Sequence, residues 1–131
     1  MKRRTFIIAA ITTTGAVTVS AVAFIHRRHE QYNPLSTPEV LSSFCDRKTL
    51  CEIGTRYLHV APEEAQVQKL QDLILTDQKG KKPASLDNVI VSNWVNEQTR
   101  QDFINRRTIT INGWIVSLTE ARQCALLSFN K

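Results

Sequence analysis

The sequence has few of the residues that most often build catalytic or metal sites. Its 131 residues include only three cysteines and three histidines (His26, His29 and His59), too few for a disulfide-stapled small protein or for a histidine-rich metal centre. It has only four glycines and four prolines, and it is 42% hydrophobic and 22% charged. This composition excludes collagen-like, low-complexity and highly charged disordered chains, and the length allows one domain.

Positive charge is in excess, but much of that excess lies at the N-terminus. The chain carries 17 basic and 12 acidic residues, a net charge of +5. Lys2, Arg3 and Arg4 supply three of the positive charges, so the rest of the chain has a net charge of only +2. A nucleic-acid-binding domain normally has a much stronger basic footprint. We therefore do not expect a nucleic-acid partner.

The first 25 residues have the layout of an export signal. A basic start is followed by an uncharged stretch at residues 5–25, which contains the small-residue triplet Ala21-Val22-Ala23. A positively charged segment, an apolar helix and small residues at the cleavage site are typical of secretory signals. Cleavage after Ala23 is expected, with Ala21 and Ala23 as the small side chains that the peptidase accepts.

The type of signal is indicated by the residues around the arginine pair. Arg3, Arg4 and Phe6 match the R-R-x-F pattern of twin-arginine signals, which direct export of folded proteins, although Lys2 replaces the usual Ser or Thr. Threonines dilute the apolar stretch, and Arg27 and Arg28 follow it. One alternative stays open: about 20 apolar residues can span a bilayer, so residues 5–25 could be kept as an inner-membrane anchor.

The sequence after residue 25 predicts an exposed linker at residues 26–37 and one helical domain at residues 38–131. Helices are expected to start at Thr37, at Asp46 or Thr49, at Pro62 and at Ser85, where capping residues precede apolar positions at helical spacing. The predicted inner faces of the first and fourth helices are, in that order, Val40, Leu41 and Phe44, and Leu86, Val89, Ile90, Trp94 and Val95.

A β-hairpin is predicted before the last helix. Residues 108–111 alternate between Thr and Ile, Asn112-Gly113 is a strong two-residue turn signal, and residues 114–116 continue the second strand. Ser117 and Glu120 then form a capping box that opens a final helix. The expected fold is mainly α, a small bundle of four or five helices with one β-hairpin, preceded by the signal helix.

Trp114 and Ile115 are the best candidates for a partner-docking surface. They lie beside the hairpin turn, and a hairpin this small must lean on the bundle to be stable. Trp114 could therefore be a core residue. It could also be an aromatic anchor for another protein, of the kind that dominates many interfaces.

The three cysteines, Cys45, Cys51 and Cys124, leave several interpretations open. They could be small buried apolar residues, or export could allow one disulfide among them. On one continuous helix, Cys45 and Cys51 would be too far apart to bridge. A catalytic thiol is not expected, because no base or electropositive partner is visible in the sequence.

No other motif predicts catalysis. Glu63, Glu64 and Asp102 look like solvated or capping residues, and no carboxylate pair lies in a visibly apolar setting. His59 is expected at a helix end, and residues 79–82 form a basic loop. Phosphate-binding loops, dinucleotide fingerprints and nucleophile elbows are absent from the sequence. We expect no catalytic residue, no metal and no cofactor.

Two blocks of sequence resemble a known group of exported proteins. The first is LSSFCDRKTLCEIGTRYL at residues 41–58, followed by Pro62-Glu63-Glu64. The second combines DFINR at residues 102–106 with TINGWIVSLTEARQCAL at residues 110–126. With the twin-arginine start, these resemble the short proteins that accompany periplasmic flavin-dependent oxidoreductases of the glucose–methanol–choline type, such as the small subunits of membrane-bound sorbitol, fructose and gluconate dehydrogenases.

The resemblance implies a non-catalytic role. In those families the small subunit binds no flavin, supplies the export signal for a catalytic subunit that lacks one, and supports that subunit's stability. The expected partners are therefore a larger flavin-dependent oxidoreductase and the export machinery, and the expected location is the periplasm. The alternative is a structural or envelope protein attached to the inner membrane through residues 5–25. A small exported enzyme is a third hypothesis.

Overall fold

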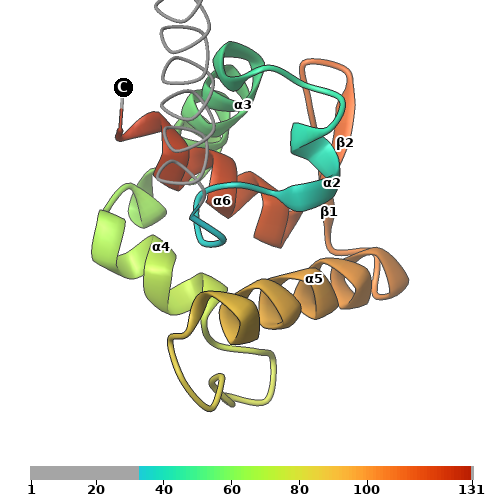
Figure 1. Cartoon of the computed structure of the whole chain (residues 1–131). Helices are drawn as coiled ribbons and strands as arrows, with labels where there is room; N and C mark the ends of the chain where they lie inside the picture. Colours follow the sequence, from blue (N-terminus) through green and yellow to red (C-terminus); the bar gives the residue numbers. More distant parts are fainter. Residues whose placement is uncertain (1–32, 131) are drawn as a thin grey trace, which may run out of the picture. The chain divides into compact units, whose positions relative to one another are not determined.

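The protein is mainly helical and ends in a β-hairpin followed by a helix. The structure, a computed structural model, describes residues 33–130. Over this range the elements are α2 (Glu39–Ser42), α3 (Arg47–Val60), the short 3-10 helix η1 (Pro62–Glu64), α4 (Val67–Ile74), α5 (Asn88–Ile104), β1 (Thr108–Ile111), β2 (Trp114–Ser117) and α6 (Leu118–Ser128) (Figure 1). The mainly α prediction with a hairpin before the last helix is confirmed. The predicted signal, with Arg3, Arg4, Phe6, Ala21 and Ala23, lies outside the described residues.

α6 is the centre of this arrangement. It contacts α3, α4, α5 and both strands of the hairpin, and Figure 1 shows it in the middle of the fold. Because neighbours surround it, nearly all of its residues are buried rather than one stripe. The predicted capping box is confirmed: Ser117 Oγ accepts a bond from Glu120 N at 3.0 Å, and Glu120 Oε1 accepts one from Ser117 N at 3.0 Å.

Among the described residues, α3 and α6 share the most extensive contact between two elements. Gly54 lies in the middle of α3 against the backbone of α6, and a methyl group added to its Cα would overlap the carbonyl oxygen of Cys124. Ala121, Cys124 and Ala125 on α6 are fully buried small residues. Small side chains on both helices therefore let the two backbones approach each other.

The hairpin forms as the sequence predicts. The strands are antiparallel, with Ile111 opposite Trp114 and Thr108 opposite Ser117. Asn112 and Gly113 have φ values of 52° and 83°, the two positive values that a type I′ turn requires. Ile111 and Val116 are buried and attach the hairpin to the rest of the core.

Several helix starts and faces differ from the sequence-based predictions. The first helix begins at Glu39 with Pro38 as its N-cap, and the fourth has Asp87, rather than Ser85, as its N-cap. Of the two predicted starts of α3, Asp46 and Thr49, the first is the N-cap, and the Asp46 side chain accepts a bond from Thr49 N at 2.8 Å.

The apolar face of α5 is rotated relative to the predicted one. Val91 and Val95 are buried, whereas Leu86, Val89 and Ile90 are exposed. Trp94 is partly buried, and its indole N–H donates to the carbonyl oxygen of Ile74 at the end of α4. Phe44, which was predicted to face the core, is also exposed. The side of a helix that is buried depends on the elements packed against it, and the spacing of apolar residues alone does not identify those elements.

Residues 33–37 pack against the domain. Pro34 and Ser36 are buried, and Ser36 N donates to Asn33 O in a tight turn. Gln123 Nε2 on α6 donates to Pro34 O at 2.7 Å. This end of the predicted linker therefore belongs to the folded part of the chain.

Candidate functional site

Trp114 and Ile115, the predicted docking residues, are both exposed, with 38% and 66% of their surfaces accessible. They are consecutive in β2, so their side chains leave opposite faces of the hairpin. Trp114 is paired with Ile111 and shares the inner face of the hairpin with the buried Ile111 and Val116. Ile115 is paired with Thr110 and lies on the outer face. The two residues therefore do not form one continuous patch.

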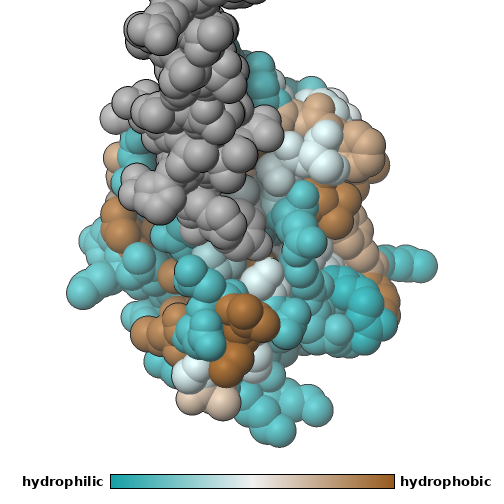
Figure 2. Space-filling model, viewed as in Figure 1, coloured by the Kyte–Doolittle hydropathy of each residue, from teal (hydrophilic) through white to brown (hydrophobic). Residues whose placement is uncertain are grey.

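Other large apolar side chains are also exposed on this domain. Figure 2 shows apolar patches between hydrophilic areas on the face in view. α5 contributes exposed apolar residues at both ends: Val89 and Ile90 near its start, and Phe103 and Ile104 at its end. Its last residues precede the hairpin, and α5 contacts β2. α5 and the hairpin therefore each carry large apolar side chains that the described residues leave uncovered.

The three cysteines are free thiols in this structure. Cys51 and Cys124 are buried in the core, and Cys45 is half-buried at the junction of α2 and α3. Burial raises the pKa of the Cys124 thiol, and the nearby Glu120, Cys45 and Cys51 raise it further. A thiol kept protonated in this way is a poor nucleophile. The disulfide stays a prediction for the oxidised protein.

Two carboxylates that were expected to be solvated are buried, which corrects the prediction. Glu64 lies between the buried Tyr57 and the half-buried Arg122: Tyr57 Oη donates to its Oε2 at 2.7 Å, and Arg122 Nε donates to its Oε1 at 2.7 Å. Burial, and then the hydrogen bond to Glu64, raise the pKa of Tyr57 to about 12. This Tyr57–Glu64–Arg122 network joins α3, η1 and α6.

Asp102 is the second buried carboxylate. Its Oδ2 accepts bonds from the backbone N and the hydroxyl of Thr119, at 2.9 and 2.7 Å, in the first turn of α6. An acidic group is favourable at that end of a helix, and Arg107 lies 3.9 Å from its other oxygen. Asp102 thus attaches the end of α5 to the start of α6. The three buried carboxylates among the described residues, Glu64, Asp102 and the capping-box residue Glu120, all have structural partners.

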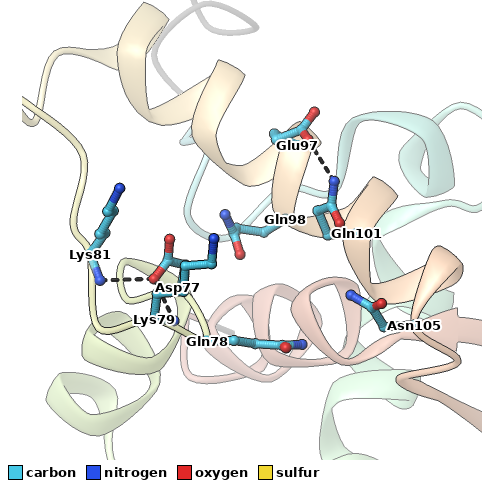
Figure 3. A pocket seen from close by; sticks show the side chains of 8 residues that line it. All are labelled: Asp77, Gln78, Lys79, Lys81, Glu97, Gln98, Gln101 and Asn105. Carbon is cyan, nitrogen blue, oxygen red and sulfur yellow. Dashed lines mark hydrogen bonds between the residues drawn. The ribbon is translucent and has the colours of Figure 1, made fainter.

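A polar hollow of about 370 Å³ lies between residues 77–81 and α5 (Figure 3). Asp77 Oδ1 accepts bonds from Lys79 N and Lys81 N, each at 2.8 Å, which fixes the turn of the loop. On the other side, Gln98, Gln101 and Asn105 extend from α5, and Gln101 donates to Glu97. All of the lining residues are exposed or half-buried, so water reaches every polar group in this hollow.

Two further hollows are formed by the described residues. One, of about 620 Å³, is lined by residues of α3 and the hairpin turn: Glu52, Thr55, Arg56, His59 and Asn112. The other, of about 250 Å³, lies between α2, α5 and α6 and includes Gln123. The sequence alone does not predict this last hollow. The only hint of it is a glutamine, Gln123, among the small and apolar residues of the last helix. No group of His, Cys, Asp or Glu side chains within residues 33–130 is arranged to hold a metal ion.

Comparison with known proteins adds no relative. No family model matches the chain, and no characterised protein or solved structure matches it at a significant level. Over residues 33–130, none of the helices has the length and apolarity needed to cross a bilayer.

Proposed function

We propose that this protein is an exported, non-catalytic accessory subunit that binds and stabilises a larger periplasmic oxidoreductase and is exported together with it. The partner proposed is a flavin-dependent enzyme of the glucose–methanol–choline type that lacks a signal of its own. Residues 1–25 would supply the twin-arginine signal, which is either cleaved after Ala23 or kept in the inner membrane. The helical domain would supply the contact with the partner.

The observation that carries the proposal is the set of exposed apolar side chains on α5 and the hairpin, Ile115 above all. Ile115 is a large aliphatic side chain with two thirds of its surface exposed, and it lies on the outer face of a strand in a two-stranded sheet. Exposed apolar groups on a small domain commonly mark a protein interface. An outer strand edge can also pair with a partner's strand.

The hydrogen bonds of the buried carboxylates support a non-catalytic role. Glu64 and Asp102 have strong hydrogen bonds inside the domain, and these bonds hold helices together. The arginine pair, Phe6 and the two sequence blocks that resemble oxidoreductase small subunits support the location and the class of partner.

The proposal can be tested by purifying the tagged chain from cells that also produce the signal-less flavoprotein. We expect the flavoprotein, identified by its mass and its flavin absorbance, to be retained in a constant ratio to the tagged chain. Ile115→Ser should reduce this ratio about tenfold or more, because a well-placed apolar anchor contributes about 2 kcal/mol to binding.

The matched control is Val60→Ser. Val60, the last residue of α3, is as exposed as Ile115, with 68% of its surface accessible against 66%, and it lies outside α5 and the hairpin. This variant should retain the flavoprotein. Equal losses in the two variants would place the contact elsewhere, and a flavoprotein that never co-purifies with the wild-type chain would contradict the proposed function.

A further inference from the structure

The hairpin turn contains the only Asn-Gly pair in the sequence, Asn112-Gly113. Both residues lie outside the strand pairing, which joins residues 108–111 to residues 114–117. Both are exposed, and no atom lies within 4 Å of the position that a side chain on Gly113 would take. Water and dissolved bases therefore reach the Asn112 amide and the backbone N–H of Gly113.

The chemistry open to this pair is an intramolecular attack on the side-chain amide. The backbone nitrogen of Gly113 loses its proton to a base in solution and forms a bond to Asn112 Cγ. The bond from Cγ to Nδ2 breaks, and the side-chain nitrogen takes up a proton and leaves as ammonia. The attack is easiest when the second residue is glycine, because glycine has no side chain beside its nitrogen.

The product of this attack is a five-membered imide, which water opens in one of two ways. Cleavage of the new bond between Cγ and the Gly113 nitrogen gives aspartate in an ordinary main chain. Cleavage of the original peptide bond gives isoaspartate, in which the main chain runs through Cβ and Cγ. Asparagine and one water molecule are thus converted into either acid and ammonia, with no oxidant or cofactor.

The folded turn opposes ring closure. Asn112 and Gly113 have φ values of 52° and 83°, as in a type I′ turn, in which ψ of the first central residue is about 30°. At that ψ the Gly113 nitrogen lies nearly trans to Asn112 Cβ about the Cα–C bond. Because the ring needs this nitrogen and Cβ on the same side of that bond, the turn must open before the imide can form.

Buried packing of the two strands keeps the turn closed. Ile111 and Val116, on either side of the turn, are 5% and 0% exposed and belong to the hydrophobic core. Opening of the hairpin would expose both side chains to water, which makes the open state rare. The rate of reaction at Asn112 should therefore depend on how firmly these two residues are packed.

We propose that Asn112 is a modification site of the folded protein, where local opening of the hairpin turn allows conversion to aspartate and isoaspartate. The two products have different consequences. Aspartate retains the turn, since Asp-Gly also favours the type I′ conformation. Isoaspartate lengthens the main chain by one atom, so the two-residue turn loses its geometry and the hairpin is destabilised.

The proposal is tested by incubating the full-length chain in detergent at mildly alkaline pH, followed by peptide mapping with mass spectrometry. A methyltransferase specific for isoaspartate distinguishes the two products. We expect conversion at Asn112 in the folded chain, more slowly than in the same chain unfolded in urea. Asn93, which lies within α5 and precedes a bulky tryptophan, is the internal control and should stay unchanged.

Two outcomes of this incubation would overturn the proposal. If the folded chain shows no conversion at Asn112 while the unfolded chain reacts to completion, Asn112 is not a modification site of the folded protein. If the folded and unfolded chains react at equal rates, the turn does not control the reaction.

A pair of variants separates opening of the hairpin from unfolding of the whole domain. Val116→Ala removes a buried side chain from the hairpin and leaves Asn112-Gly113 intact, and Val95→Ala makes the same change in the buried face of α5. Val116→Ala should speed conversion about fivefold or more, because it lowers the free energy of opening the hairpin. Val95→Ala should have a smaller effect, and equal acceleration in the two variants would overturn local opening as the route.

The consequence of the modification has its own control. Chains that contain isoaspartate, separated by chromatography, should have a lower thermal midpoint than the Asn112→Asp variant. That variant carries the same added charge in a main chain of ordinary length. Equal midpoints would overturn the proposed effect of isoaspartate on the turn.

Discussion

The two sides of α6 are built in different ways. Towards α3, small residues bring two helix backbones into contact at Gly54 and Cys124, and the Tyr57–Glu64–Arg122 network connects the same elements. Towards α5 and the hairpin, α6 is attached by Asp102 and by the buried Val116. Large apolar side chains such as Phe103 and Ile115 stay exposed on that second side.

The difference between the two sides of α6 indicates that one side chiefly determines the stability of the domain and the other chiefly its binding to a partner. Close backbone contact tolerates no added volume, so the α3 side should respond strongly to small substitutions. Exposed apolar groups contribute little to the stability of the isolated domain, so substitutions of those groups should chiefly affect binding. The following predictions test this separation, from the largest expected effect to the smallest.

Gly54→Ala should have the largest effect on stability. The added methyl group would overlap the backbone of α6 at Cys124, and a backbone cannot move aside as a flexible side chain can. We expect the free energy of unfolding to fall by about 3 kcal/mol or more, measured by chemical denaturation. A loss below about 1 kcal/mol would show that the two helices are not in close contact.

Tyr57 should make stability dependent on pH in the alkaline range. Its pKa is raised from an ordinary value of 10 to about 12 in the folded protein, so the folded state retains a proton that the unfolded state loses. Its contribution is complete below pH 10 and is lost as the pH rises from 10 to 12, a decrease of about 2 kcal/mol. Tyr57→Phe should remove this part of the pH dependence, and an unchanged profile in that variant would contradict the network.

Gly113→Val tests the hairpin on the other side of α6. Gly113 has a φ of 83°, and no atom lies near the position where a side chain would begin. The cost should therefore come from the backbone alone, about 1–2 kcal/mol, and appear as a lower thermal midpoint. An unchanged midpoint would mean that the turn does not require a positive φ at this residue.

Arg106→Gly should stabilise the protein slightly. Arg106 follows the C-cap of α5 with a φ of 57°, and Arg107 N closes the helix end by donating to Asp102 O at 2.8 Å. Glycine adopts this conformation without the steric cost that arginine has. We expect a gain of about 0.5–1 kcal/mol, and a loss of stability would indicate that the Arg106 side chain has an important contact.

The features that the sequence predicted correctly are those determined by a few adjacent residues. Asp46 caps α3, Asn112 and Gly113 form the turn, and Ser117 with Glu120 opens α6. Each depends on short-range geometry that the residue types themselves impose.

The features that it did not predict depend on contacts between distant parts of the chain. Glu64 and Asp102 are ordinary acidic residues in the sequence, and they are buried because Arg122 and Thr119 reach them from α6. The buried face of α5 is likewise set by the elements packed against it. The hollow around Gln123 joins residues that are more than 80 positions apart, such as Pro38 and Gln123, and no local pattern marks such a site.

The central claim, that this chain carries a partner across the membrane, is tested most directly by the location of the flavoprotein in cells. Arg3→Lys with Arg4→Lys keeps the charge of the signal but removes the guanidinium groups that a twin-arginine receptor would bind. With the wild-type chain, flavin-containing enzyme should be found in the periplasmic fraction, and with the double variant it should stay in the cytoplasm. Enzyme that reaches the periplasm equally well with the double variant, or in cells lacking this chain, would contradict the account.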